Sequence, residues 1–115
     1  MTIARLGVAV FLILHGVSHP LVWGVYRAER WDPRHSWLTR GDATMPALVL
    51  AGITAACFVA AAFALVTRAQ WTPYAALGGA TASLLLIGLT FNLRWWAGVT
   101  LDAVVIVLAV RALTS

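Results

Sequence analysis

Three ionisable side chains interrupt apolar stretches of this sequence, and they are the residues that could do chemistry. His15 and His19 lie four positions apart near the start of the chain, and Asp102 lies in its last apolar stretch. In a helix, a spacing of four places two side chains on the same face. A titratable side chain inside a membrane span costs about 2.5–3.5 kcal/mol on insertion scales, so each of the three needs a physical reason.

Imidazole and carboxylate groups in this setting could form a pocket for the head group of a quinone or a lipid. Histidine titrates near neutral pH, so such a pocket could also transfer protons. His15 would face the ligand, His19 would lie at the mouth, and Asp102 would accept hydrogen bonds or balance charge. The ligand-binding set is completed by Trp23, one turn beyond His19, and Asn92, at the end of the third apolar stretch.

Two other roles compete with this pocket. His15, His19 and Asp102 could ligate a metal ion, since two imidazoles four residues apart can reach one ion and a carboxylate can supply a third ligand. No further carboxylate is available to support the ion, and two imidazoles on one face cannot bracket a haem. Metal and haem therefore lack firm support, and the cofactor is left open, with a quinone as one candidate. Alternatively, a histidine bonded to Asp102 only ties two membrane helices together.

The elements that must position these residues are long apolar segments. Of the 115 residues, 62% are hydrophobic and 10% are charged, whereas about a quarter of an average soluble domain is charged. A helix needs roughly 20 apolar residues to cross the hydrocarbon core, and four stretches qualify: residues 3–26, 45–66, 73–91 and 96–113. The sequence predicts an all-α integral membrane protein, a single bundle of four transmembrane helices over residues 1–115.

The loop between the first two stretches, residues 27–44, is the longest connection. Asp32 and Pro33 are typical of a helix start, and Gly41 is typical of a helix end. Between them, Trp37 and Leu38 could lie in the headgroup layer. We therefore expect a short interfacial helix in this loop.

Small residues at intervals of four predict close helix packing within the bundle. The second stretch has one such row: Gly52, Ala56, Ala60 and Ala64. The third stretch has two candidate pairs: Gly78 with Ala82, and Gly79 with Ser83.

The ionisable residues are expected to meet at one depth. With a rise of 1.5 Å per residue, His19 lies about 8 Å and His15 about 14 Å from the loop end of the first helix, and Asp102 lies about 9 Å from the start of the fourth. The first and third loops of a four-span chain lie on the same side of the membrane, so these depths match. Pro20 cannot donate to the Gly16 carbonyl, so we also expect a local bend beside His19.

Charge sets the expected location and partners. All eight basic residues are Arg; five lie in the first and third loops, and three lie near the termini and in the second loop. The positive-inside rule then places both termini outside the membrane, in a multi-pass arrangement. The Arg residues form no clustered basic face, which argues against nucleic acid. The expected partners are membrane lipid and either another membrane protein or a second copy of this chain.

The first apolar stretch contains FLILHGVSHPL (residues 11–21), and three further spans follow it. With these features the chain resembles the DoxX-like family of small four-helix bacterial membrane proteins. The segment Leu101-Asp102-Ala103 is similar to the Leu-Asp-Ala segment common near the end of such chains. The resemblance implies that His15, Gly16 and Asp102 are shared positions. It also implies a supporting role in a membrane oxidoreductase assembly, as some members have. The chain lacks the paired cysteines that direct thiol chemistry would need.

We therefore expect a small membrane accessory or ligand-binding protein, with an intramembrane polar pocket of His15, His19 and Asp102. We do not expect an enzyme acting alone, because no nucleophile with an oriented base and an oxyanion hole can be named. The alternative is a purely structural subunit of a larger membrane complex, in which the contact between histidine and aspartate serves only helix packing.

Overall fold

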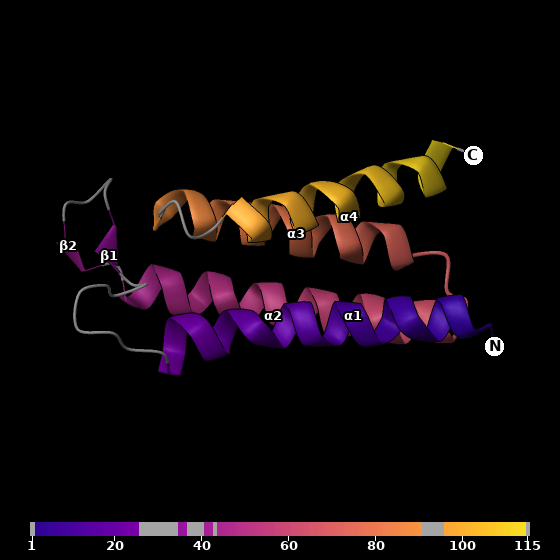
Figure 1. The fold of residues 1–115 in the computed structure, drawn as a ribbon, viewed down its shortest axis with the longest axis horizontal. Helices are drawn as coiled ribbons and strands as arrows, with labels where there is room; N and C mark the ends of the chain where they lie inside the picture. The colour runs from indigo at the N-terminus through magenta and orange to yellow at the C-terminus, as the bar shows by residue number, and fades with distance from the viewer. Residues whose placement is uncertain (1, 26–34, 37–40, 43, 91–95, 115) are drawn as a thin grey trace.

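Four long helices make up nearly all of the structure, a computed structural model that describes residues 2–25, 35–36, 41–42, 44–90 and 96–114. The helices are α1 (Ile3–Pro20), α2 (Thr44–Val66), α3 (Thr72–Leu89) and α4 (Trp96–Thr114), and α1 continues into a π-helical turn, η1 (Leu21–Val25) (Figure 1). All four are long and apolar enough to cross a membrane. The predicted four-helix, all-helical architecture is confirmed at this level.

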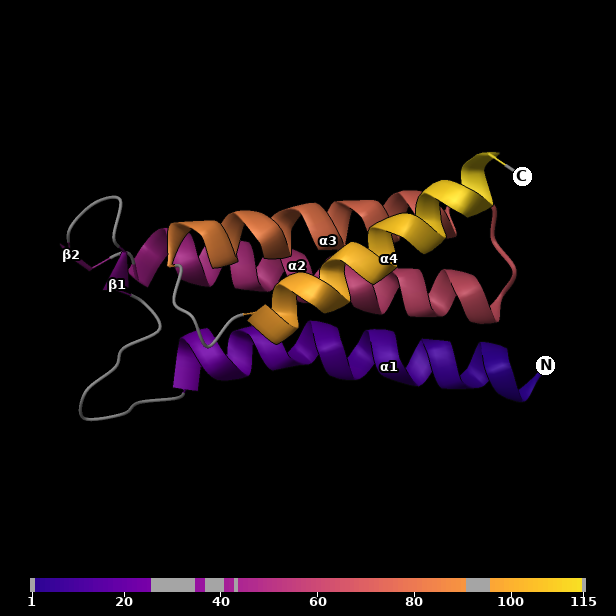
Figure 2. The same ribbon diagram turned by 45° about the horizontal axis from the view of Figure 1, so that its top comes forward.

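The helices run alternately up and down the long axis of the molecule, which measures 44 Å. Figure 1 shows both chain ends and the α2–α3 turn together at one end, here called the terminal end. α1 packs on α2, α2 on α3, and α3 on α4. Figures 1 and 2 both show the C-terminal half of α4 leaning away from α1.

The end of α1 changes helix type at Pro20. Proline has no amide hydrogen, so the Gly16 carbonyl loses its usual backbone donor. The chain continues as the five-residue π-helical turn η1, whose first amide still reaches the Val17 carbonyl. Single π-helical turns are frequent at functional sites, and this one directly follows His19 and contains Trp23.

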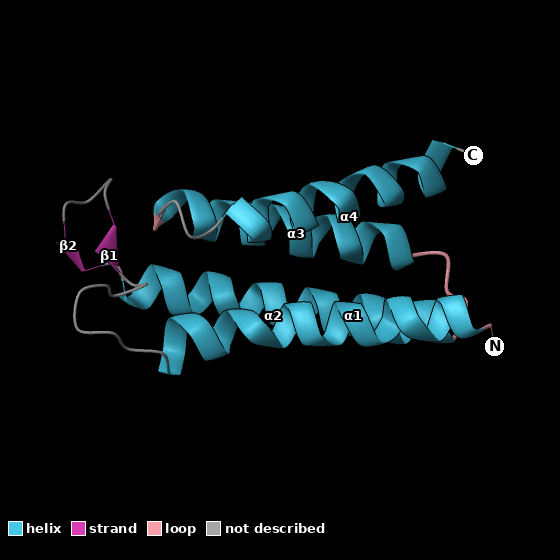
Figure 3. Ribbon diagram, in the orientation of Figure 1, coloured by secondary structure: helices cyan, strands magenta, loops and turns pink. Residues whose placement is uncertain are grey.

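The first loop contains a short strand pair where the sequence predicts an interfacial helix. β1 (His35–Ser36) pairs antiparallel with β2 (Gly41–Asp42), with His35 opposite Asp42 (Figure 3). The helix predicted there is not evident, and His35 and Ser36 are extended. Isolated helices shorter than about 12–15 residues are marginal, whereas a strand pair satisfies backbone groups over a few residues. The other residues of this loop, 26–34, 37–40 and 43, lie outside the described residues.

Phe58, in the middle of α2, is fully buried and lies at the centre of the packing. A Cβ at Gly16 of α1 would lie 2.7 Å from the Phe58 Cβ, and a Cβ at Gly79 of α3 would lie 3.1 Å from the Phe58 ring. Glycine is therefore required at Gly16 for α1 to approach α2 this closely. The same aromatic side chain fits against α3 because Gly79 has no side chain.

The small residues of α2 and α3 pack only in part as the sequence predicts. Gly52 of α2 is exposed, whereas Ala64 at the other end of the row is buried. On α3, both members of the pair Gly79 and Ser83 are buried, whereas in the other pair Ala82 is buried and Gly78 is exposed. A helix that is apolar on all sides does not show, by its pattern alone, which side faces its neighbours.

Candidate functional site

One face of the first helical segment carries four rings: Phe11, His15, His19 and Trp23. The Phe11 and His15 rings are stacked with centroids 5.5 Å apart, and the His19 and Trp23 rings are stacked at 5.7 Å. Between these pairs the two imidazoles meet edge to face at 5.0 Å. Phe58 packs against both imidazoles. The histidines are therefore enclosed by apolar rings on their own helix and by α2.

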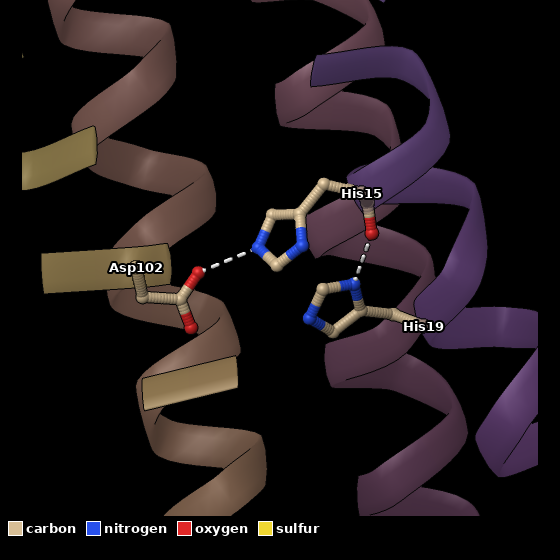
Figure 4. Close-up of side chains that lie close together, drawn as sticks. All are labelled: His15, His19 and Asp102. Atoms are coloured by element: carbon tan, nitrogen blue, oxygen red, sulfur yellow. Dashed lines mark hydrogen bonds and ion pairs between the residues drawn. The ribbon is translucent and has the colours of Figure 1, made fainter. Parts of the chain in front are cut away.

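His15 is joined to Asp102 across the bundle. His15 Nε2 lies 2.9 Å from Asp102 Oδ1, and Asp102 is fully buried (Figure 4). Hydrogen bonds between polar side chains help to hold membrane helices together. The first and last helices are thus bonded at the common depth predicted from the helical rise.

Ser83 of α3 links the second histidine to the same carboxylate. Its Oγ lies 2.7 Å from His19 Nε2 and is also hydrogen-bonded to Asp102 Oδ2. His19 Nδ1 donates to the His15 carbonyl at 2.8 Å (Figure 4). His15, His19, Ser83 and Asp102 form one bonded unit, here called the buried polar cluster, which joins α1, α3 and α4.

Trp23 and Asn92 are the two further residues that the sequence assigns to the site. Trp23 stacks on His19, and its Nε1 donates to Thr90 Oγ1 at 3.0 Å, so it borders the cluster and is fixed to the end of α3. Asn92 lies outside the described residues. Sequence reasoning missed Ser83, which it treated only as a small packing residue. The signal that could have found it is a hydroxyl in the middle of an apolar helix.

The buried polar cluster is closed by its own bonds. In the described part of the chain, no buried side-chain nitrogen or oxygen lacks a hydrogen-bond partner. One ligand atom each from His15, His19 and Asp102 could approach a metal ion, because these atoms lie within 4.8 Å of one another. The Nε2 atoms of both imidazoles are already bonded, however, to Asp102 and to Ser83. A metal would have to break these bonds, so the set fits hydrogen bonding better than metal binding.

An apolar groove lies between α1 and α4, on the side of the cluster nearer the chain ends. Its volume is about 480 Å³, and all four helices contribute to its lining. Gly7 and Phe11 line it from α1, and Val105 and Leu108 line it from α4. Phe11 also stacks on His15. The groove therefore begins where the polar bonds between α1 and α4 stop.

A guanidinium group is bonded to one of the residues that line the groove. Arg5 Nη1 donates at 2.9 Å to the carbonyl of Leu65, which lines the groove. Arg68 and Arg111 are exposed at the same terminal end. Apart from Asp102, every acidic residue of the sequence lies in the first loop. The described residues at the terminal end thus include cations and no acidic side chain, which favours an anionic group there.

In comparisons with known proteins, no protein-family model, curated protein or solved structure matches the chain. The resemblance to the DoxX-like family stays a prediction from His15, Gly16 and Asp102. The fold and the site define a four-helix protein with apolar helices, a buried polar cluster and an apolar groove beside it.

Proposed function

We propose that this protein is a multi-pass membrane protein that binds an anionic lipid in the groove between α1 and α4. The four helices cross a bacterial plasma membrane with both termini outside, as the greater number of Arg residues in the first and third loops favours. The groove then opens into the outer leaflet. One observation carries the proposal: an apolar groove with the Arg5 guanidinium bonded to the carbonyl of Leu65, one of its lining residues.

The outward faces of the helices support membrane insertion. Leu14, Phe63, Leu85 and Val107, one from each helix, are all more than half exposed. Exposed apolar surface of this extent is rare on monomeric soluble proteins, whereas lipid tails are as apolar as these side chains. Trp71 is exposed in the α2–α3 turn, where an aromatic ring suits the headgroup layer.

The chemistry of the groove favours a hydrocarbon chain with an anionic head. Its apolar walls offer dispersion contacts to a chain, and its volume of about 480 Å³ lies within the range of about 300–1,000 Å³ typical of ligand pockets. An arginine has five N–H donors, so a guanidinium held by the Leu65 carbonyl can also bond a phosphate oxygen. The lipid therefore has its chain between α1 and α4 and its phosphate at Arg5.

The role of the histidines in this proposal differs from the head-group pocket that the sequence predicts. The buried polar cluster holds α1 to α4 at the inner end of the groove, and Phe11 lies between the groove and the His15 ring. A quinone could place its chain in the same groove, but it lacks an anionic group for Arg5. Quinone binding and support of a redox partner therefore become outcomes of the test below.

A second candidate function is that of a structural subunit in a larger membrane complex. The observation that favours it is the buried polar cluster, whose bonds join three helices. Under this alternative an apolar helix of a neighbouring protein covers the groove, and no lipid stays bound.

The experiment fills the groove from α1. Gly7 lines the groove, and a Cβ at Gly7 meets no heavy atom within 4 Å, so the Cβ of Gly7→Leu fits there and the rest of the side chain occupies the groove. Gly52 of α2 is exposed and equally open, and it does not line the groove, so Gly52→Leu is the matched control. The full chain is extracted in mild detergent, and native mass spectrometry counts the phosphatidylglycerol and quinone bound to each variant.

We expect the wild type and Gly52→Leu to retain phosphatidylglycerol in a stoichiometric amount, and Gly7→Leu to lose it. Arg5→Gln should lower the preference for phosphatidylglycerol over phosphatidylcholine about fivefold, because one arginine contributes about 1 kcal/mol to binding of anionic lipid. Equal retention in the two leucine variants would overturn the groove as the site. A stoichiometric amount of bound quinone would identify the ligand as a quinone instead of a lipid. A constant protein partner without lipid would favour the structural subunit.

A further inference from the structure

Ser83 lies between two groups that compete for its single hydrogen. Its Oγ is 2.7 Å from His19 Nε2 and is also hydrogen-bonded to Asp102 Oδ2. A hydroxyl group carries one hydrogen, so Ser83 can donate to only one of these two atoms. The other contact is a hydrogen bond only if His19 or Asp102 supplies the proton.

The protonation of His19 is fixed at its other ring nitrogen. His19 Nδ1 lies 2.8 Å from the His15 carbonyl oxygen, which can only accept a hydrogen bond. Nδ1 therefore carries a hydrogen. In a neutral imidazole with this tautomer, Nε2 is an acceptor, and it becomes a donor only when the ring is protonated.

Two proton arrangements satisfy both contacts of Ser83. In the first, a protonated His19 donates from Nε2 to Ser83 Oγ, and Ser83 donates to the Asp102 carboxylate. In the second, Asp102 is a neutral acid that donates from Oδ2 to Ser83 Oγ, and Ser83 donates to Nε2 of a neutral His19. A neutral His19 together with an ionised Asp102 leaves one of the contacts without a hydrogen. Both allowed arrangements therefore contain one additional proton.

We infer that His19, Ser83 and Asp102 hold one shared proton and form an intramembrane proton relay. In the forward shift, the N–H bond at His19 Nε2 breaks and its proton bonds to Ser83 Oγ. At the same time the original hydroxyl proton of Ser83 moves to Asp102 Oδ2. The reverse shift restores the first arrangement, so a proton passes between α1 and α4 with no other reactant and no change of side-chain position.

The surroundings of the relay favour keeping this proton. α2 presents the Phe58 ring, η1 presents the Trp23 ring, and α1 presents His15, whose Nε2 is 2.9 Å from Asp102 Oδ1. The described residues of α3 and of the N-terminal half of α4 include no other charged side chain. With the shared proton, His19 and Asp102 have no net charge. Without it, a buried carboxylate needs a counter-charge from His15 or is left uncompensated, which is costly in apolar surroundings.

The relay goes beyond lipid binding and does not depend on it. None of its three residues lines the groove, so a failure of the lipid proposal leaves this inference untouched. The relay makes the centre of the bundle a site that holds a proton within the apolar layer and passes it between helices.

Spectroscopy of the full chain in lipid bilayers at neutral pH tests the relay. Nuclear magnetic resonance of ¹⁵N-labelled histidine distinguishes protonated from neutral rings, and infrared spectroscopy of ¹³C-labelled aspartate detects a carboxylic acid. In the wild type we expect a protonated His19, an Asp102 carboxylic acid, or both in fractions that add up to one proton. Ser83→Thr keeps the hydroxyl and should keep these signals. Among the described residues, the Ser18 hydroxyl donates to the His15 carbonyl and is not bonded to Ser83 or Asp102, so Ser18→Ala is the matched control and should also keep them.

Ser83→Ala removes the link, and we expect His19 to become a neutral ring with its hydrogen on Nδ1. If Ser83→Ala does not fold, His19→Gln replaces it. An amide donates to Ser83 without exchanging a proton, so the carboxylic acid signal of Asp102 should disappear. A wild type with neutral His19 and ionised Asp102 would overturn the relay. So would a proton located on His15 instead, or a folded Ser83→Ala variant with unchanged spectra.

Discussion

The half of the bundle that contains the buried polar cluster and the half that contains the groove are held together by different forces. In the cluster half, the His15–Asp102 bond draws α4 towards α1, and Ser83 adds α3. In the groove half, no such bond joins the described residues of α1 and α4, and α4 leans away (Figure 2). Apolar side chains gain little free energy when they leave lipid and pack against another helix instead. Specific polar bonds therefore decide where these two helices meet.

The largest expected effect comes from removing the shared partner in the cluster half. Asp102→Ala leaves His15 Nε2 and Ser83 Oγ without the carboxylate, and breaking a buried pair by removing one partner costs about 3–5 kcal/mol. We expect a loss of this size in the free energy of unfolding in detergent, measured by chemical denaturation. Asp102→Asn keeps an oxygen at this position and should lose less. If the free energy of unfolding of Asp102→Ala lies within about 0.5 kcal/mol of the wild-type value, the buried polar cluster does not stabilise this half of the bundle.

Two glycines of α1 allow the halves to be compared on one helix. Gly16→Ala places a Cβ 2.7 Å from the Phe58 Cβ, and overpacking of this kind typically costs 1–3 kcal/mol, so we expect about 2 kcal/mol. Gly7→Ala introduces the same methyl group into the open groove and should cause no loss of stability. Thermal unfolding of both variants in the same detergent measures the difference. Equal effects at the two positions would contradict the difference in packing between the halves.

A substitution of Trp23, at the border of the buried polar cluster, should lower the free energy of unfolding by a smaller amount. Trp23→Phe keeps an aromatic ring to stack on His19 and removes the Nε1 donor to Thr90. A hydrogen bond contributes about 1 kcal/mol to stability, so we expect a loss of about this size in the free energy of unfolding. Thr90→Val removes the acceptor, and the double variant should lose less than the sum of the two. Strict additivity would mean that this bond does not fix Trp23 to α3.

The smallest effect is expected at the turn beyond the groove half. Arg68 follows α2 with a φ of 59°, in the left-handed region that costs non-glycine residues about 1 kcal/mol. Arg68→Gly should therefore raise the free energy of unfolding by up to about 1 kcal/mol. Arg68→Ala removes the same charge and keeps the strain, so it serves as the control. Identical stability of the two variants would show that the backbone there is not strained.

The helices and the depth of the ionisable groups could be predicted because both depend on simple lengths. A span needs a fixed number of apolar residues, and a fixed rise per residue places His15, His19 and Asp102 at matching levels. The interfacial helix was predicted from Asp32, Pro33 and Gly41, but such end signals do not exclude strand pairing, and His35 is extended instead.

The linking role of Ser83 and the groove could not be predicted in the same way. The sequence places Ser83 in a row of small residues, and only the rotation of α3 about its axis decides whether its hydroxyl faces Asp102 or lipid. The groove depends on the tilt of α4 away from α1, which no local pattern encodes. Both features arise from how the helices pack against one another.

A double-mutant cycle between His15 and Asp102 tests most directly the claim that one polar bond holds α1 to α4. His15→Leu, Asp102→Leu and the double variant are unfolded in the same detergent, and their free energies of unfolding are compared with that of the wild type. Contacting residues show coupling of about 0.5–3 kcal/mol, and we expect at least 1 kcal/mol here, with the double variant less destabilised than the sum of the two single ones. Additivity within about 0.3 kcal/mol would contradict the account.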